Sequence, residues 1–343
     1  MWKASEMRRA ILGINLLGLL LLGGCADDPE AAATLSVKGY VEAELDTLHA
    51  ASVALQRAAP EPDADGWNAR DDAEAVASMR REWARARAAY ERIEGAIAVL
   101  FPHLDVSTDE RYDGFIELEA DADLFDGEGA TGMHAIERIL WADAHPPNVV
   151  AFESSLVGYA PARFPETEAE ARRFRDALVA RLIEDIETMR TQFAPLALDP
   201  ATAFGGVIGS MGEQVEKISL AATGEDESRY AQTTLADMRA NLEGGRQIYL
   251  AFQPWVRAHG PEADDEVAAG FDRLDAAYGA LSGDSLPPVP EGWNPDEPDP
   301  AHLDGAYGRL WQRVSAEADP DSPTSLVSAM RAAARVIDVP IAP

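Results

Sequence analysis

Apolar residues recur every three to four positions along most of the chain, which is the spacing of amphipathic helices. The first such stretch spans 35–59, where Val41, Leu45 and Leu48 continue one apolar stripe. No stretch shows the strict alternation of apolar and polar residues that predicts a half-buried strand. The pattern therefore predicts an all-α protein.

The same spacing predicts eight further helices, and their ends are marked by proline and by polar connections. Pro102 stops the second helix and Pro165 introduces a later one. We expect loops at 103–114 and 286–300, and an irregular acidic segment at 115–131. The predicted helices span 71–101, 132–141, 166–194, 201–222, 229–258, 262–281, 301–317 and 322–338.

Long helices joined by short connections pack as antiparallel bundles. A weak internal similarity supports two such bundles: the stretches 90–102 and 239–254 both place an acidic residue and Gly before an aromatic residue and Pro. We therefore predict two tandem, related helical bundles, the first at about 34–200 and the second at about 201–343.

The first 24 residues have the pattern of an export signal. A basic start with Lys3, Arg8 and Arg9 precedes the apolar run 11–22 and a small-residue pair. The run is too short for a membrane span, which needs ~20 residues. Residues 1–24 are therefore predicted to be a signal peptide.

Cys25 follows directly, and LLGGC resembles the lipobox of bacterial lipoproteins, which carry a lipid on that cysteine. It is the only cysteine in the chain, so no intrachain disulfide can form. We expect a lipid anchor on Cys25 and a polar tether over 25–33, with structure beginning near residue 34. A free thiol after an ordinary secretory signal is the alternative.

The chain is strongly acidic, with 60 Asp and Glu against 29 Lys and Arg and a net charge of −31. Residues 1–24 hold three basic residues and one acidic residue, so the remainder carries −33. This balance argues against nucleic acid as a partner and favours a metal ion or another cationic ligand. The alternative is that the protein comes from a salt-tolerant organism or one with an acidic proteome. In that case most of these charges lie on solvated helix faces and serve solubility.

The stretch GMHAIERILW, residues 132–141, places His134 and Glu137 three positions apart, on one face of its predicted helix. With 6 His and 30 Glu in 343 residues, about 0.5 such pairs arise by chance, so spacing alone is weak evidence. His259 and Glu262 repeat the spacing, but Gly260-Pro261 break the helix between them.

Several other chemistries lack their motifs. Ala135 and Arg138 stand where a zincin protease needs Glu and a second His, and no Gly-x-Ser-x-Gly or P-loop occurs. The acidic stretch 121–129 has Phe125 at the fifth position and Asp126 at the sixth, the wrong register for a calcium-binding EF-hand loop. These absences do not argue against a metal site built from a different arrangement of ligands.

Glu91 and Glu94 strengthen the metal hypothesis because of where they lie. Their spacing matches chance, but they sit near the end of a helix that one connection joins to the helix of His134. Helical bundles build metal sites from Glu and Glu-x-x-His residues that project inward. One imidazole with several carboxylates suits iron, with copper, zinc and calcium as alternatives. A solvated helix face is the competing interpretation.

Three segments in this order resemble the imelysin family, and within it the EfeO-type periplasmic component of bacterial iron uptake. They are REWARARAAYERIEGAIAVLFPHLDVSTDERYDGF, GMHAIERILWAD and TGEDESRYAQTTLADMRANLEGGRQIY. The resemblance covers about 36–340 and rests on a Gly-x-His-x-x-Glu box, here Gly132, His134 and Glu137. It implies two tandem helical bundles, and so one imelysin-like domain over 34–343.

The resemblance also implies a set of metal ligands. Glu91, Glu94, His134 and Glu137 match the family's acidic and His-x-x-Glu positions, and Asp109 falls on a further acidic position. A last carboxylate is expected in MGEQVEKISL, where Glu216 is our choice and Glu213 the alternate by one helical turn. Gln232 and Thr234 replace a His and an Asp that EfeO-type proteins often carry, so a second site there is in doubt.

These features predict a lipid-anchored cell-envelope protein that binds iron and delivers it to an inner-membrane permease. One rival is a metallopeptidase, following a historical label of the family, although a single His-x-x-Glu supplies no independent general base. The other rival is an adhesin or polysaccharide-binding lipoprotein with a vestigial box. No catalytic residue is assigned.

Overall fold

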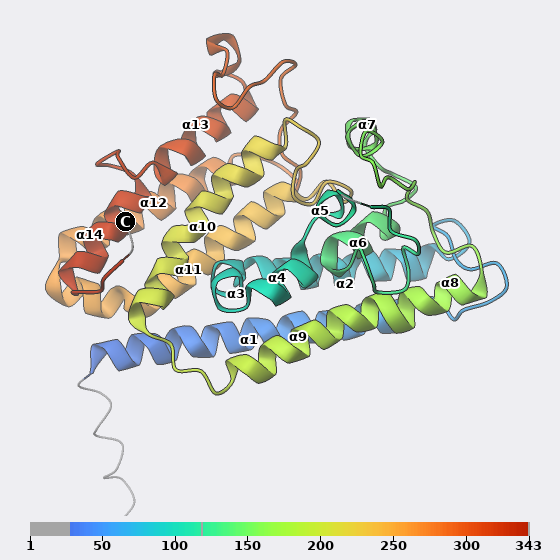
Figure 1. Cartoon of the computed structure of the whole chain (residues 1–343). Coiled ribbons are helices and arrows are strands. Elements are labelled where there is room, and N and C mark those ends of the chain that lie inside the picture. The colour runs from blue at the N-terminus through green and yellow to red at the C-terminus, as the bar shows by residue number, and fades with distance from the viewer. Residues whose placement is uncertain (1–27, 118, 342–343) are drawn as a thin grey trace, which may run out of the picture.

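The computed structural model of the protein describes residues 28–117 and 119–341 (Figure 1). Within these ranges the regular elements are helices and no strand occurs, which confirms the all-α prediction. The predicted signal peptide and Cys25 lie outside the described residues. None of the helices in the described ranges is long and apolar enough to cross a membrane.

Three long helices form the frame of the N-terminal half: α1 (Pro29–Ala58), α2 (Ala73–Glu91) and α9 (Val179–Phe193). Both α2 and α9 pack against α1. The shorter helices are α3 (Glu94–Leu100), α4 (Pro102–Asp109), α5 (Tyr112–Ile116), α6 (Gly132–Leu140), α7 (Pro147–Glu153) and α8 (Glu168–Arg173), and a π-helical turn, Phe174–Leu178, joins α8 to α9.

The C-terminal half contains α10 (Pro200–Leu220), α11 (Thr234–His259), α12 (Pro261–Gly279), α13 (Ala306–Ala318) and α14 (Leu326–Val336), with one 3₁₀ turn at Pro300–His302. Helix α11 packs against α10 and α12 in its own half and against α1 and α2 of the other. The two halves therefore share one apolar core. This arrangement is compatible with tandem bundles, and their internal relationship stays a prediction.

Helix α1 begins earlier than the sequence pattern predicts. The Asp28 side chain accepts hydrogen bonds from the backbone N–H groups of Glu30 and Ala31, and Pro29 occupies the first helical position. Both features favour a helix start. Residues 29–33 are therefore helical, although we expected a tether up to residue 33.

The helix predicted at 71–101 is interrupted between the two glutamates of interest. Helix α2 ends at Glu91, and α3 begins at Glu94 after a turn at Arg92-Ile93. Gly244 of α11 packs on this turn so closely that a Cβ there would lie 2.1 Å from the Arg92 carbonyl oxygen. No proline or glycine lies within the turn itself, between Glu91 and Glu94, and a contact with a distant helix accompanies the break.

The connection that follows also differs from the prediction. The segment 103–114, expected to be a loop, contains most of α4 and the start of α5, because Pro102 opens a helix rather than only ending one. Helix α7 was not predicted either. The described residues between Ile116 and Gly132 are irregular, as expected.

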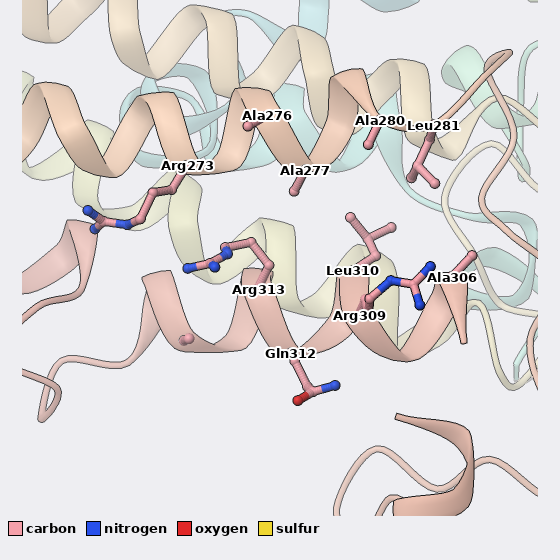
Figure 2. A pocket seen from close by; sticks show the side chains of 11 residues that line it. Arg273, Ala276, Ala277, Ala280, Leu281, Ala306, Arg309, Leu310, Gln312 and Arg313 are labelled. Carbon is pink, nitrogen blue, oxygen red and sulfur yellow. The ribbon is translucent and has the colours of Figure 1, made fainter. Parts of the chain in front are cut away.

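A cleft of about 740 Å³ lies between α12 and α13 (Figure 2). Its lining is mostly Ala and Leu, with the guanidinium groups of Arg273, Arg309 and Arg313. No carboxylate or imidazole lines this cleft, so the ligand-type side chains of the chain gather elsewhere.

Candidate metal centre

Helix α6 is buried on all sides, because each of its nine residues is inaccessible to solvent. A buried polar side chain is costly unless it finds a partner. Arg138 donates two hydrogen bonds to Glu153 Oε2, at 3.0 and 3.1 Å. His134 and Glu137 pair with each other, with Asp109 of α4 and with the connection between α10 and α11. The His-x-x-Glu pair is therefore not on a solvated face.

Gly132 allows α6 to start directly against the end of α4. Its φ is +80°, and a Cβ at this position would lie 2.3 Å from the Thr108 carbonyl oxygen. Only glycine fits both conditions. On the other side, the Trp83 indole donates a hydrogen bond of 2.9 Å to the Met133 carbonyl oxygen. These contacts bring His134 next to Asp109.

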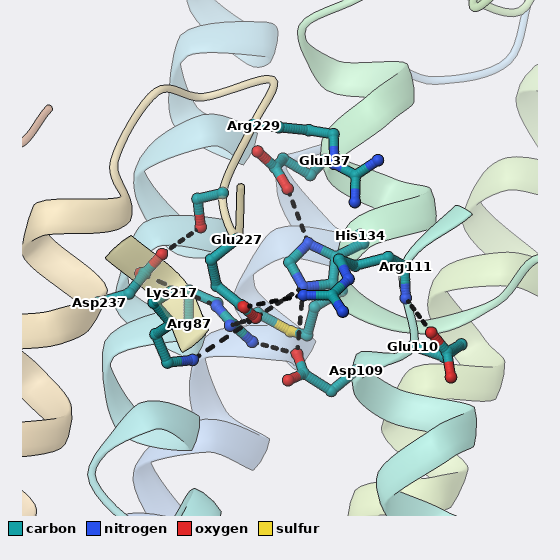
Figure 3. A network of polar contacts seen from close by, with 12 residues as sticks. Arg87, Asp109, Glu110, Arg111, His134, Glu137, Lys217, Glu227, Arg229 and Asp237 are labelled. Atoms are coloured by element: carbon teal, nitrogen blue, oxygen red, sulfur yellow. Dashed lines mark hydrogen bonds and ion pairs between the residues drawn. The ribbon is translucent and has the colours of Figure 1, made fainter. Parts of the chain in front are cut away.

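The imidazole of His134 lies between carboxylates on two sides (Figure 3). Its Nδ1 is 2.9 Å from Glu137 Oε2, while Nε2 is 3.3 Å from Glu227 Oε1 and 3.5 Å from Asp109 Oδ1. His134 is 1% exposed. Ligand atoms of Asp109, His134 and Glu227 lie within 4.8 Å of one another, close enough to hold one ion.

Glu137 uses both of its oxygens in internal hydrogen bonds. Oε2 accepts from His134, and Oε1 accepts from the backbone N–H groups of Tyr230 at 2.9 Å and Ala231 at 2.8 Å. A carboxylate at Nδ1 fixes the ring orientation and the tautomer, which leaves Nε2 for an ion. In this geometry Glu137 orients His134 rather than facing the same ion.

A second group of carboxylates adjoins the first and shares Glu227 with it. Oxygens of Glu91, Glu94 and Glu227 also lie within 4.8 Å of one another. The ammonium of Lys217 on α10 is 3.0 Å from Glu91 Oε1, 3.2 Å from Glu94 and 3.6 Å from Glu227 Oε1. Asn241 Nδ2 donates to Glu94 Oε2 at 2.8 Å. Glu91 Oε2 is buried and has no hydrogen-bond partner among the described residues.

The guanidinium of Arg87 on α2 connects the two groups. It donates to Asp109, Glu91 and Glu227, and its Nε lies 3.8 Å from Asp237 Oδ1. The cluster thus holds two buried basic side chains, Arg87 and Lys217, and the half-buried Arg111, 3.6 Å from Glu227 Oε2, against six acids. Those acids are Glu91, Glu94, Asp109, Glu137, Glu227 and Asp237. Protons or a metal ion must offset the excess of buried negative charge.

The titration of the cluster follows from this excess. Burial lowers the pKa of His134, but its hydrogen bonds to Glu137 and Glu227 outweigh burial and raise the pKa to about 9. Burial raises the pKa of Asp109 to about 7, against the opposing charge of Arg87. Burial opposes ionisation of Glu227 too, yet nearby Lys217 and His134 hold its pKa well below the usual range. His134 is therefore protonated at neutral pH when no ion is bound.

Five of the six predicted ligand residues lie in this cluster: Glu91, Glu94, Asp109, His134 and Glu137. Glu216 does not. Its side chain is 53% exposed and pairs with Arg111 at 3.4 Å. Glu213, the alternate, is half-buried and belongs to neither ligand group. Helix α10 instead turns Lys217 toward the cluster.

Of the two substituted positions, Gln232 lies on the connection between α10 and α11, and Thr234 is the first residue of α11. Gln232 has a φ of +58°, and its side chain donates to the Arg229 carbonyl oxygen at 2.7 Å. Thr234 Oγ1 donates to Asp226 Oδ2 at 3.2 Å. Both side chains serve local structure in the described part of the chain, and neither joins the two ligand groups.

Sequence reasoning missed Glu227, Arg87 and Lys217. Glu227 lies in the polar stretch TGEDESRY, where nothing in the spacing sets it apart from Glu225. The two basic residues could have been found from the helical pattern of the sequence. Lys217 continues the inward stripe of α10 one turn after Gln214, and Arg87 lies one turn after Trp83 on the inward face of α2.

Comparison with known proteins supports the resemblance found in the sequence. The family model described as imelysin matches residues 39–310. The iron uptake system component EfeO of Escherichia coli K12 is 26% identical over 263 residues, which cover 76% of this chain and 59% of that protein. The same figures hold for EfeO of Shigella flexneri and of Escherichia coli O6:K15:H31. The chain thus spans about three fifths of the length of these relatives. Because the family model covers most of its residues, including the whole buried cluster, this chain belongs to the imelysin family.

Proposed function

We propose that this protein captures iron in the cell envelope and belongs to an iron-uptake system. The observation that carries the proposal is the buried group of Asp109, His134 and Glu227, whose ligand atoms lie within 4.8 Å of one another. Relatives named as iron uptake system components support the choice of cargo. One nitrogen and two carboxylate ligands suit iron better than copper(I), which prefers sulfur.

In the proposed complex, Nε2 of His134 and carboxylate oxygens of Asp109 and Glu227 bind the ion. Pairing with Arg87 leaves these carboxylates further lone pairs for a metal. Glu137 holds the imidazole in place through Nδ1. Asp109 and Glu227 have the more exposed side chains of the three, at 11% and 8% against 1% for His134, so the ion enters from their side.

The proposal also includes the location of the protein in the cell envelope and the delivery of its iron. The basic and apolar start of the chain and Cys25 support export and a lipid anchor. A tethered iron-binding protein would hand its ion to an inner-membrane permease. The three ligand side chains are at most 11% exposed, which favours a small ion as cargo.

The proposal is tested by titrating the protein calorimetrically with iron(II) under anoxic conditions, and with zinc, copper and calcium. The test variant carries His134→Ala and Glu137→Ala. The matched control carries His259→Ala and Glu262→Ala, a pair with the same spacing but with both residues exposed at the surface.

We expect the test pair to weaken iron binding by at least ~100-fold, because one ligand and its orienting partner are lost. The control pair should leave the affinity unchanged, and circular dichroism should show intact helices in both. Equal affinity in wild type and test variant would contradict the proposal. Peptide cleavage that is lost only in the test pair would favour the metallopeptidase instead.

A further inference from the structure

The two adjacent groups of ligand-type atoms share Glu227, but different positively charged side chains lie next to their carboxylates. In the group of Asp109, His134 and Glu227, the acids face the imidazole of His134 and the guanidinium groups of Arg87 and Arg111. The group of Glu91, Glu94 and Glu227 surrounds an ammonium. All three carboxylates direct oxygens to Lys217 Nζ, within 3.0–3.6 Å.

Lys217 is an unusual residue in this chain. The sequence contains only three lysines. Of the two in the described part, Lys38 donates to backbone carbonyl groups at the end of α9, near the surface, whereas Lys217 is 1% exposed. An ammonium is rarely buried so completely without close charged partners. Its surroundings of three carboxylates are those of a bound cation.

One atom in this group lacks a partner. Glu91 Oε1 accepts from Lys217, but Glu91 Oε2 is buried and has no hydrogen-bond partner among the described residues. An ammonium has three donors and forms bonds with one oxygen each. A metal ion can bind both oxygens of one carboxylate. The group therefore has more ligand capacity than Lys217 uses.

We propose that Lys217 is a built-in cation that occupies a second metal position and limits the centre to one ion per chain. This inference rests on the proposed function for the first position. The tethered ammonium supplies one positive charge where a free ion would supply two or three. It therefore holds Glu91, Glu94 and Glu227 in place while denying them to a second ion.

The test counts metal ions in variants at this residue. Lys217→Met removes the charge at similar length, and Lys217→Arg retains it. Lys38→Met is the matched control, because it removes a lysine that lies outside the cluster and contacts backbone carbonyl groups, Glu42 and the ring of Phe193. Each protein is loaded with iron(II) under anoxic conditions and passed through a desalting column. Bound iron per chain is then measured by mass spectrometry and calorimetry.

We expect one ion in wild type, Lys217→Arg and Lys38→Met, and two ions in Lys217→Met. Adding Glu94→Gln to Lys217→Met should return the count to one. A single ion in both wild type and Lys217→Met, or two ions in wild type, would overturn the proposal. If Lys217→Met does not fold without metal, iron should restore its helical signal, and failure of iron to do so would also overturn it.

Failure of this inference can be told apart from failure of the proposed function. The double variant Lys217→Met with His134→Ala should retain one ion, held by Glu91, Glu94 and Glu227. If wild type binds no iron while Lys217→Met binds one ion, the proposed function fails and the role of Lys217 stands. If wild type binds one ion that depends on His134, and Lys217→Met also binds only one, the proposed function stands and the role of Lys217 fails.

Discussion

Binding of iron at His134 should release protons, and the amount follows from the metal-free state of the site. The hydrogen bonds of His134 to Glu137 and Glu227 outweigh its burial and raise its pKa to about 9, and burial raises the pKa of Asp109 to about 7. A metal ligand must be deprotonated. Protons held by these two groups are therefore displaced when the ion enters.

At pH 7, His134 gives up about one proton and Asp109 about half a proton, so the release should be about 1.5 protons per ion. At pH 8 it should fall to about one, because Asp109 is then mostly ionised. The metal-free protein binds the extra protons, so apparent affinity must rise with pH. The rise near pH 7 should be about 30-fold per pH unit, and it should flatten above pH 9.

The release is measured by calorimetric titration with iron(II) in buffers of different ionisation enthalpy at each pH. Asp109→Asn should lower the release at pH 7 to about one proton, since only His134 then contributes. Full iron binding in wild type with a release near zero would refute the reasoning, because the ion would not then use the His134 ring nitrogen.

Three further outcomes follow from single contacts. Gly132→Ala should lower the free energy of unfolding in urea by about 2–4 kcal/mol, since φ is +80° and the new Cβ would meet the Thr108 carbonyl; an unchanged midpoint would contradict this. Glu216→Ala should change iron affinity less than about twofold in calorimetry, because an exposed ion pair contributes little, and a tenfold loss would return Glu216 to the site. Glu153→Ala should destabilise the protein to urea by about 3–5 kcal/mol, because it leaves the charge of Arg138 buried and unpaired; a loss below 1 kcal/mol would mean that water reaches this arginine.

The helical class could be predicted from the sequence because apolar periodicity persists over long segments. The break between Glu91 and Glu94 could not, because it coincides with the close approach of Gly244, which lies about 150 positions further along the chain. Local sequence carries no record of such a contact. The same applies to the start of α4, where Pro102 is compatible with both the end of one helix and the beginning of another.

The candidate site was predictable where its residues share a helix. His134 and Glu137 lie one turn apart on α6, so their common face follows from helical geometry. Glu227 comes from a connection, and no periodicity places a loop residue next to a helix from the other half of the chain. Lys217 lies on the apolar stripe of α10 and could be predicted to point inward, but ligand chemistry points to His, Asp and Glu and not to lysine or arginine.

The connection that carries Glu227 is buried from Asp226 to Tyr230, and Glu137 accepts hydrogen bonds from the backbone amides of Tyr230 and Ala231 within it. The same glutamate steadies the imidazole of His134. With iron held as we propose, the ion would link the two halves of the molecule, because Asp109 and His134 belong to the N-terminal half and Glu227 to the C-terminal half. Displacing this connection alone would withdraw Glu227 from the ion and the two amides from Glu137, so release of the ion would not need a rearrangement of the long helices.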